Sequence, residues 1–461
     1  MSVKKGQELE LEISELAFGG KGIARKDGLA VFVDQTLPLD IVIARIIKKK
    51  KNFANALVVK ILEESPLRIK PSCIYSSHCG GCKWQFLRYE KQLVYKRQHV
   101  IDSLEHIGTI KGVTVHPTIP SKLIYGYRNK MEFSCSDRRW LMPDEMGMEN
   151  LDLNFALGLH VPGTFHKVLD INKCLLQPGR GNDILNDIKV FIKNSDAPVY
   201  GLRSHIGFWR FVMLRHSAAY DQWMVNIVTA EKSNKIVKPL ADLLTAKYPE
   251  IVSVMNNINT RKAGIAVGEY EILLAGSPFI KEKIGLFEFK ISANSFFQTN
   301  TLGAEILYEK VKEYVNLSGE EYVVDLYSGA GTIAIFLAGS AKELIGIEIS
   351  KSAVRDAEAN CRDNGISNCR FILGDIKDCL KHVEKPDVMI IDPPRAGMHK
   401  DVVKQVLDIS PEKIVYVSCN PATMARDLSI MKDNYKVLEV QPVDMFPHTY
   451  HIESVARIER K

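Results

Sequence analysis

Residues 322–339, YVVDLYSGAGTIAIFLAG, decide the fold of this chain. The apolar run YVVDL predicts a buried strand, and IAIFLAG predicts a helix. Between them lies SGAGT, whose glycines, Gly329 and Gly331, permit a tight turn and a close approach of backbone to a ligand. A strand, a glycine-rich turn and a helix in this order are typical of the first unit of a doubly wound, nucleotide-binding sheet.

The segments that follow repeat this alternation of strand and helix. Helix-length segments separate the strand candidates ELIGIEI (343–349), CRFIL (369–373), PDVMIID (386–392) and KIVYVS (413–418). The alternation predicts a mostly parallel, Rossmann-like domain over residues 286–461. The last two apolar runs, YKVLEVQ (435–441) and HIESVARIE (451–459), lie too close together for a helical crossover, so we expect an antiparallel pair at the sheet edge.

Acidic residues end three of the predicted strands, at the edge where ligands bind in open α/β sheets. Glu348 lies seventeen residues after Gly331, in place to accept hydrogen bonds from a ribose diol, which fits NAD(P) and S-adenosylmethionine equally. Asp375 ends the third strand, in place for an adenine amino group. Asp392 begins DPPR, whose two prolines make a stiff turn. An acid-Pro-Pro element beside a cofactor favours S-adenosylmethionine and methyl transfer to a nucleobase.

A cysteine ends the fifth predicted strand. Cys419 in this position is more often an inert buried residue, but beside a methyl donor its thiolate can add to C6 of a uracil and make C5 nucleophilic. A general base must then remove the C5 proton, and we expect Glu453 in the last strand to do so. His448 and His451 are competing bases that rank lower, because a carboxylate is ionised at neutral pH without any adjustment of its pKa.

The N-terminal part of the chain has a different pattern. Residues 6–62 show about five short strands, which predict an OB-like β-barrel within residues 1–65. Residues 41–70 carry eight Lys or Arg against two Glu, a charge excess that fits either a solvated loop or an edge that tracks phosphates. Mixed strand and helix patterns predict a central α+β domain over residues 70–285.

The segment CIYSSHCGGC, residues 73–82, holds three cysteines in C-x5-C-x2-C spacing. Such a group predicts a metal site, and the spacing alone leaves zinc and iron–sulfur centres open. Cys174 and Cys135 are candidates for a fourth ligand, and Cys135 lies in the strand-like MEFSC, which favours a buried role. We interpret Cys361, Cys369 and Cys379 as structural.

Composition limits the class of protein. A chain of 461 residues, 46% hydrophobic and 25% charged, is typical of a soluble protein of two or three domains. No apolar run approaches the roughly 18 residues of a membrane span, and MSVKKGQELE has no signal-peptide core. We therefore expect a cytoplasmic protein with nine cysteines that are not disulfide-bonded, and no feature indicates a membrane or an obligate protein partner.

Five ordered motifs resemble those of the RNA 5-methyluridine (uracil-C5) methyltransferases. These motifs are ANSFFQTN (293–300), DLYSGAGT (325–332), IDPPRAG (391–397), VSCNPATMARDL (417–428) and HIESV (451–455). Residues 6–62 also resemble the TRAM domain of that family, and CIYSSHCGGC matches the cluster motif of its iron–sulfur members.

The resemblance implies a role for individual residues. Cys419 would be the nucleophile and Glu453 the base, and Cys174 would complete a [4Fe–4S] cluster that is structural or positions RNA. Arg128 and Lys130 would contact RNA, and segments near residues 93–120 would pack on the catalytic domain. The implied contacts to S-adenosylmethionine are Gln298, Tyr327, Glu348, Asp392, Asp375 and Thr332.

The sequence thus predicts a multidomain α/β enzyme with a TRAM barrel, a cluster-bearing central domain and a Rossmann-like methyltransferase domain. The expected substrate is 23S ribosomal RNA, with a transfer RNA uridine as the alternative. A radical methylthiotransferase is disfavoured by the C-x5-C-x2-C spacing and by Cys419. An amino-group methyltransferase or a non-catalytic RNA-binding module would need neither Cys419 nor Glu453.

Overall fold

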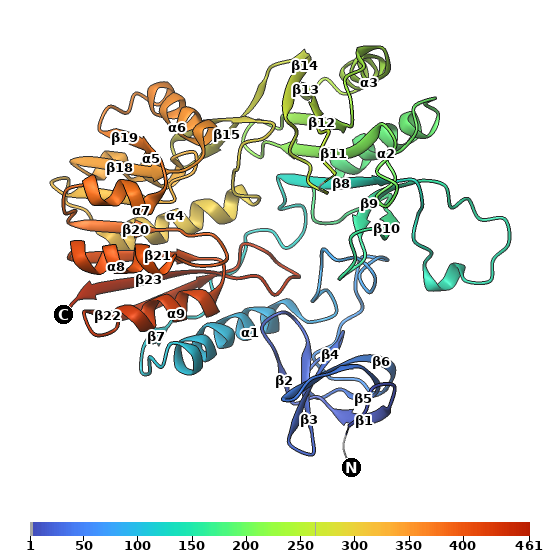
Figure 1. Cartoon of the computed structure of the whole chain (residues 1–461), viewed down its shortest axis with the longest axis horizontal. Helices are drawn as coiled ribbons and strands as arrows, with labels where there is room; N and C mark the ends of the chain where they lie inside the picture. Colours follow the sequence, from blue (N-terminus) through green and yellow to red (C-terminus); the bar gives the residue numbers. More distant parts are fainter. Residues whose placement is uncertain (1–2, 263) are drawn as a thin grey trace.

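The computed structural model describes residues 3–262 and 264–461, which form three sheets, a hairpin and their covering helices (Figure 1). The N-terminal sheet has the order β1-β5-β6-β4-β3-β2 and curls around a small core that includes Val31, Val42 and Ala54. Its strands are β1 (Glu8–Glu12), β2 (Glu15–Leu16), β3 (Gly22–Lys26), β4 (Leu29–Asp34), β5 (Ile41–Lys49) and β6 (Phe53–Glu63). The two-residue β2 is too short to show a period of two in the sequence.

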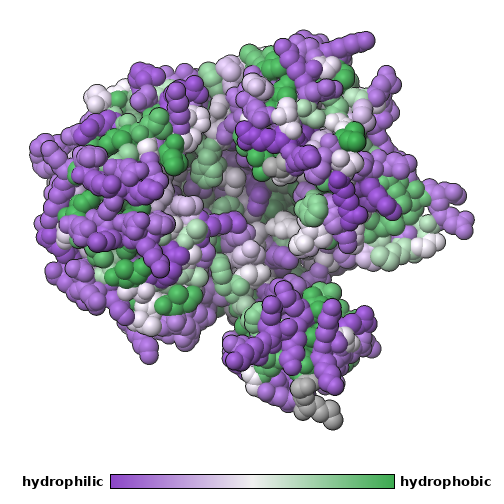
Figure 2. Space-filling model, viewed as in Figure 1, coloured by the Kyte–Doolittle hydropathy of each residue, from purple (hydrophilic) through white to green (hydrophobic). Residues whose placement is uncertain are grey.

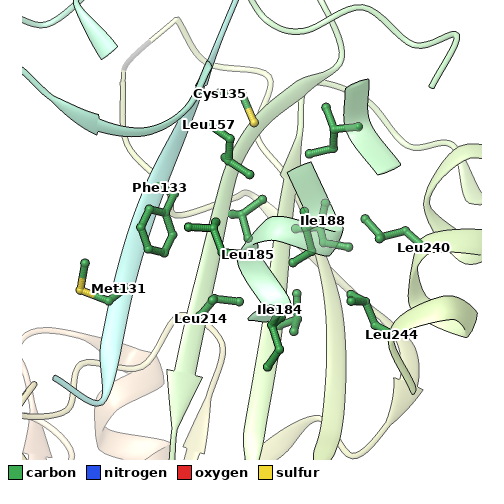
Figure 3. Packing of buried hydrophobic residues seen from close by; sticks show 14 of the residues in the cluster. Met131, Phe133, Cys135, Leu157, Ile184, Leu185, Ile188, Leu214, Leu240 and Leu244 are labelled. Atoms are coloured by element: carbon green, nitrogen blue, oxygen red, sulfur yellow. The ribbon is translucent and has the colours of Figure 1, made fainter. Parts of the chain in front are cut away.

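The central sheet is mostly antiparallel and has the order β10-β9-β8-β11-β12-β13-β14. Its strands are β8 (Lys130–Ser136), β9 (Ala156–His160), β10 (Val168–Asp170), β11 (Trp209–His216), β12 (Trp223–Thr229), β13 (Ile251–Ile258) and β14 (Tyr270–Gly276). Helices α2 (Gly179–Lys193) and α3 (Asn234–Lys247) cover one face, and a short helix, η2 (Pro143–Glu145), lies in the loop between β8 and β9. Figure 3 shows Leu185 and Ile188 of α2 packed over Phe133 and Leu214 of the sheet.

The C-terminal sheet has eight strands in the order β19-β18-β17-β20-β21-β23-β22-β7. The first five are parallel, and β23 lies antiparallel between β21 and β22. Seven of these eight strands are β17 (Tyr322–Leu326), β18 (Glu343–Glu348), β19 (Cys369–Leu373), β20 (Val388–Ile391), β21 (Lys413–Ser418), β22 (Tyr435–Val443) and β23 (Glu453–Arg460), and the eighth, β7, comes from far upstream. The predicted parallel sheet and the predicted antiparallel pair are both present.

Helices cover both faces of this sheet (Figure 1). They are α4 (Thr301–Val315), α5 (Thr332–Leu337), η3 (Ala338–Ser340), α6 (Lys351–Asp363), α7 (Ile376–Cys379), η4 (Leu380–His382), α8 (Lys400–Ile409) and α9 (Pro421–Met431). A hairpin of β15 (Phe279–Ile284) and β16 (Phe287–Ser292) precedes α4 and spans the predicted domain bound at residue 286.

The predicted position of the antiparallel pair at the sheet edge is wrong. Strand β7 (Thr114–Val115) pairs in parallel with Glu439 and Val440 of β22, so a segment from far upstream forms that edge. Helix α1 (Tyr89–Asp102) and the π-helical turn η1 (Ser103–Ile107) lead into it, and Val100 and Leu104 are buried in the core of this sheet. This is the packing that the family resemblance implied for residues near 93–120.

Residues 444–451, hereafter the 444–451 loop, join β22 to β23 and are held from outside the C-terminal region. The ammonium group of Lys96 on α1 donates to Asp444 at 2.6 Å and to the carbonyl of Phe446 at 3.0 Å, and neither Lys96 nor Asp444 is exposed. Burial lowers the pKa of Lys96, and the Asp444 carboxylate opposes that shift. The loop is therefore anchored to α1, since Lys96 lies 348 residues before Asp444 in the chain.

No helix in the described part of the chain is long and apolar enough to span a membrane.

Candidate active site

A cavity of about 760 Å³ opens at the carboxyl ends of the parallel strands in the C-terminal sheet. Figure 2 shows the molecular surface hollowed between the half built on this sheet and the half built on the central sheet. Seven of the eight residues predicted for cofactor binding and catalysis line the cavity, namely Gln298, Tyr327, Thr332, Glu348, Asp392, Cys419 and Glu453.

The glycine-rich turn after β17 has the backbone that the sequence predicted. Gly331 adopts a φ of +74°, and a Cβ there would lie 2.7 Å from the ring of Phe371, so any other residue would be strained and would clash. Gly329 adopts a φ of +55°, and a Cβ there would meet nothing within 4 Å. Tyr327 has a φ of +64°, which is unusual for an aromatic residue, and strain of this kind concentrates at functional sites.

The two residues predicted for ribose and adenine differ in their placement. Glu348 lines the cavity, and its carboxylate accepts hydrogen bonds from the N–H groups of Gly329 at 3.0 Å and Ser350 at 2.8 Å. Asp375 does not line the cavity; its carboxylate caps α7 by accepting the N–H of Lys377 at 3.1 Å. The structure therefore brings Glu348 to the cofactor turn and leaves Asp375 outside this cavity.

Sheet register places Cys419 beside Glu453. Ser418, the last residue of β21, pairs with Ser454 in the antiparallel β23. Cys419, which follows Ser418, therefore lies opposite Glu453, which precedes Ser454. Burial, together with the charges of Glu453 and Asp392, raises the pKa of Cys419 to about 11. Burial also raises the pKa of Asp392 to about 6 and that of Glu453 well above its usual value.

The competing histidines occupy different places. His451 lines the cavity, whereas His448 lies outside it and is almost fully buried, with its ring stacked on Tyr125 at 4.5 Å. Burial lowers the pKa of each histidine to about 4, so both imidazoles are neutral and weakly basic at pH 7. Of the two, only His451 lines the cavity that also contains Cys419.

Three residues at or beside the cavity were not among the predicted site residues, although each lies in one of the five motifs. Asp325 at the end of β17 is buried, and neither of its carboxylate oxygens has a hydrogen-bond partner among the described residues. Burial and the neighbouring charges of Asp392 and Glu348 raise its pKa well above the usual value. Arg395 lines the cavity within the DPPR motif, and Phe296 lines it with a side chain that is 71% exposed. A motif-based comparison of strand ends could have found Asp325.

The four predicted ligand cysteines meet at a second cavity of about 480 Å³. Cys73, Cys79, Cys82 and Cys174 all line it. Cys135 points into the hydrophobic core beside Leu157 and does not line this cavity (Figure 3). Burial raises the pKa of Cys79 to about 11 and that of Cys82 to about 12, and the nearby Arg128 guanidinium opposes both shifts.

The described cysteines of this second cavity do not form a ready-made site for a single metal ion. One tetrahedral ion needs sulfur ligands about 3.8 Å apart, given metal–sulfur bonds of about 2.3 Å. Among the described residues, no three His, Cys, Asp or Glu side chains form a group that could hold a metal ion.

The two predicted RNA contacts lie at the wall of the cysteine cavity. Arg128 lines both cavities, whereas Lys130 lines the cysteine cavity alone. The ammonium group of Lys130 forms an ion pair with Glu132 at 2.6 Å.

The parallel strands β19-β18-β17-β20-β21 have the order 3-2-1-4-5, and with the Glu348 carboxylate on the glycine-rich turn this order is typical of nucleotide-binding sheets. In dinucleotide-binding sheets a parallel sixth strand follows, whereas here the next strand, β23, is antiparallel. A thiol and carboxyl groups beside that turn suit methyl transfer to a nucleobase. The fold and site define an S-adenosylmethionine-dependent methyltransferase.

Comparison with known proteins identifies the family. Residues 276–461 match the tRNA (uracil-5-)-methyltransferase family and residues 2–59 match the TRAM domain. An uncharacterized RNA methyltransferase of Chlorobaculum tepidum is 42% identical over 99% of this chain and 97% of its own. One of Porphyromonas gingivalis is 40% identical over 98% of this chain and 99% of its own.

A solved structure agrees with these relatives. The tRNA (uracil-54, C5)-methyltransferase of Pyrococcus abyssi, in complex with S-adenosyl-L-homocysteine, matches with a TM-score of 0.77 and 30% identity, covering 97% of this chain and 99% of that one. The chain belongs to the RNA (uracil-5-)-methyltransferase family and is an S-adenosylmethionine-dependent enzyme. The methylthiotransferase and the non-catalytic RNA-binding module are thereby excluded as its class.

The raised pKa of Asp392 predicts a pH-dependent gain in stability for Asp392→Asn. A folded-state pKa of about 6 against about 3.9 in the unfolded chain means that stability is fully present below pH 4 and is lost as the pH rises through 6. In the ligand-free protein, Asp392→Asn should therefore raise the free energy of unfolding by about 2 kcal/mol at pH 8 and by little at pH 4.5.

Urea denaturation at the two pH values measures this difference. Asp378→Asn, which changes an exposed carboxyl group on α7, should shift stability by less than about 0.5 kcal/mol at either pH. An equal effect of Asp392→Asn at both pH values would show that burial does not hold its proton.

Proposed function

We propose that this enzyme methylates C5 of a uridine in RNA through a covalent adduct with Cys419. The observation that carries the proposal is the convergence of Cys419, Asp392 and Glu453 on the cavity that also contains Glu348 and Tyr327. The thiolate of Cys419 forms a bond to C6 of the uracil, and C5 then takes up the methyl group. Glu453 removes the C5 proton, and the electron pair of that C–H bond restores the C5–C6 double bond and expels the thiolate.

The charges around the cavity support a cationic ligand. Burial raises the pKa values of Asp325, Asp392 and Glu453, and neighbouring carboxylates add to the shifts at Asp325 and Glu453, so a positive charge in the cavity would favour ionisation of these acids. Neither carboxylate oxygen of Asp325 has a hydrogen-bond partner among the described residues. S-adenosylmethionine, which supplies an electrophilic methyl group when bound, carries such a charge on its sulfonium.

The same electrostatics affect the ionisation of the proposed nucleophile and the proposed base. Burial raises the pKa values of Cys419 and Glu453, nearby carboxylates add to both shifts, and Arg395 opposes them. A cation favours ionisation of both groups. We therefore propose Glu348, Tyr327, Gln298, Asp392 and Thr332 as cofactor contacts within the cavity, with Asp375 as an outlying one.

Trapping with 5-fluorouridine tests the covalent route. RNA that contains 5-fluorouridine should form a stable protein–RNA adduct in the presence of methyl donor, because fluorine cannot leave as a proton. Cys419→Ala should abolish the adduct on a denaturing gel, and Cys379→Ala, a thiol on α7 away from the cavity, should leave it unchanged. Equal trapping by Cys419→Ala would eliminate this mechanism.

We also propose that Cys73, Cys79, Cys82 and Cys174 hold a [4Fe–4S] cluster. All four thiols line one cavity, and a [4Fe–4S] cluster takes four cysteine ligands. Four cysteine ligands leave no open coordination position for substrate, so the proposed role is structural. Arg128 and Lys130 at the same wall are proposed RNA contacts.

Iron content tests this assignment. Cys174→Ala should bleach the brown chromophore and lower the iron bound per chain, with a lower yield of folded protein. Cys135→Ala is the matched control, because Cys135 is equally buried but lies in the core of the central sheet, and it should retain iron. Unchanged iron in Cys174→Ala would refute the ligand set.

The proposed substrate is 23S ribosomal RNA, in accord with the cysteine set combined with a TRAM domain. A transfer RNA uridine is the second candidate, favoured by the likeness to the Pyrococcus abyssi enzyme, which is named for uracil-54 of tRNA. We further propose a cytoplasmic location and a division into residues 1–65, 70–285 and 286–461, with residues 89–119 packed on the catalytic sheet.

Mapping 5-methyluridine in total RNA from a deletion strain separates the two substrates. Loss of the modification at a 23S position, restored by the wild-type chain and not by Cys419→Ala, is the expected result. Loss confined to transfer RNA would establish the second candidate instead.

A further inference from the structure

The 444–451 loop is the connection between the cysteine cavity and the active-site cavity. It ends two residues before Glu453, and it contributes Phe446 and His451 to the active-site lining. Its position therefore fixes where the proposed base enters the cavity. His448, in the middle of the loop, has a φ of +64°, a conformation that a non-glycine residue keeps only when its surroundings hold it.

Two buried side chains hold this loop by hydrogen bonds. The hydroxyl of Tyr127 donates to the carbonyl of Pro447 at 3.1 Å. Gln92, which is fully buried on α1, accepts the N–H of His448 at 2.8 Å, and its amide nitrogen lies 3.3 Å from Nδ1 of the same residue. The amide of Gln92 also donates to the carbonyls of Trp84 and Leu87, so it ties the loop to the segment that follows the cysteines.

The cysteine segment also binds the 444–451 loop through backbone hydrogen bonds. The N–H groups of Lys83 and Trp84, the two residues after Cys82, both donate to the carbonyl of His448, at 2.9 and 3.0 Å. The segment is closed on itself by Gln85, whose side-chain oxygen accepts the N–H of Cys73 at 3.2 Å. A shift of Cys82 would therefore pull directly on His448.

The opposite wall links the same two cavities. Tyr127 is followed by Arg128, whose N–H donates to the carbonyl of Leu176, two residues after Cys174. Asn129 next donates its N–H to the carbonyl of Thr299 at 2.9 Å and its side-chain amide to the carbonyl of Gln298 at 2.8 Å. The Cys174 segment is thus bonded to Arg128, which lines the active site, and the Cys82 segment is bonded to His448, in the loop that contributes Phe446 and His451 to that lining.

We infer that Tyr127 and Gln92 are positioning residues for proton removal by Glu453, and that an intact cysteine segment is needed to keep the 444–451 loop, and so Glu453, in place. This inference rests on the proposed function for its kinetic part, whereas its structural part does not depend on any activity.

The kinetic test separates formation of the Cys419 adduct from its breakdown. Adduct formation is measured with 5-fluorouridine RNA, and breakdown with ordinary RNA, on which Glu453→Gln should accumulate adduct and so provides the reference. Tyr127→Phe should lengthen the lifetime of the ordinary adduct about tenfold, the cost of one misplaced hydrogen-bonded group, with less than about a twofold change in its formation. Gln92→Met, which frees both the backbone and the ring of His448, should lengthen it further.

Tyr435→Phe is the matched control. Tyr435 is as buried as Tyr127 and its hydroxyl also donates to a proline carbonyl, that of Pro411 at 2.8 Å, but this contact lies away from the 444–451 loop. The variant should keep the wild-type adduct lifetime. If Tyr127→Phe and Gln92→Met slow formation and breakdown equally, or slow neither, the positioning role is wrong.

Hydrogen–deuterium exchange tests the link without reference to catalysis. Cys82→Ser should accelerate exchange at residues 444–452 as well as at Lys83 and Trp84, and should leave the distant β17 and β18 unchanged. Faster exchange near Cys82 with an unaltered 444–451 loop would overturn the link. If the wild-type enzyme forms no Cys419-dependent adduct, the proposed function fails together with the positioning role, and the exchange result still decides the link.

Discussion

Parallel register in the C-terminal sheet is the constraint on which the site depends. Strands β18, β17, β20 and β21 end at a common edge, so the residues that follow them meet there although they are far apart in sequence. The same geometry brings acids together, because Glu348 ends β18, Asp325 is the second-last residue of β17 and Asp392 directly follows β20. Their mutual repulsion in a buried space favours a cationic ligand, so strand alignment and ligand charge are linked.

The antiparallel β23 extends this constraint to the end of the chain. A strand that runs against its neighbour begins where the neighbour ends, so Glu453 at the start of β23 lies beside Cys419 at the end of β21. A parallel strand in that position would have carried its first residue to the opposite edge of the sheet. The reversed direction of one strand therefore places the proposed base beside the proposed nucleophile.

Local pattern in the sequence predicted the elements but not all of their neighbours. The apolar runs from YVVDL to KIVYVS each form a strand, and their alternation with helices gave the sheet correctly, because buried strands need continuous apolar residues. The two-residue β7 is too short to show periodicity, and its pairing with β22 spans more than 300 residues. Local sequence pattern therefore could not predict which strand forms the edge of the sheet. Asp375 stays a proposed cofactor contact, but an acid after a strand can also cap the helix that follows, and Asp375 does so outside the cavity.

The sequence offers His448 and His451 as competing bases ranked below Glu453, and long-range contacts give the two histidines different environments. His448 and His451 are three residues apart in one loop, yet the first is buried against Gln92 and Tyr125, and the second faces the cavity. Nothing in the local sequence distinguishes them, because the partners of His448 come from α1 and from residues 125–127. The residues that determine the environment of the catalytic edge are thus spread over the first third of the chain.

Shared walls explain why the central region cannot be treated as a separate binding module. Arg128 and Thr299 line both cavities, and the backbone around Arg128 is bonded on one side to the Cys174 segment and on the other to residues 298–299. Arg128 faces the cysteine thiols and also opens to the active-site cavity, where acids predominate. The proposed RNA contact Arg128 and the active-site residues 298–299 therefore share one wall with the Cys174 segment.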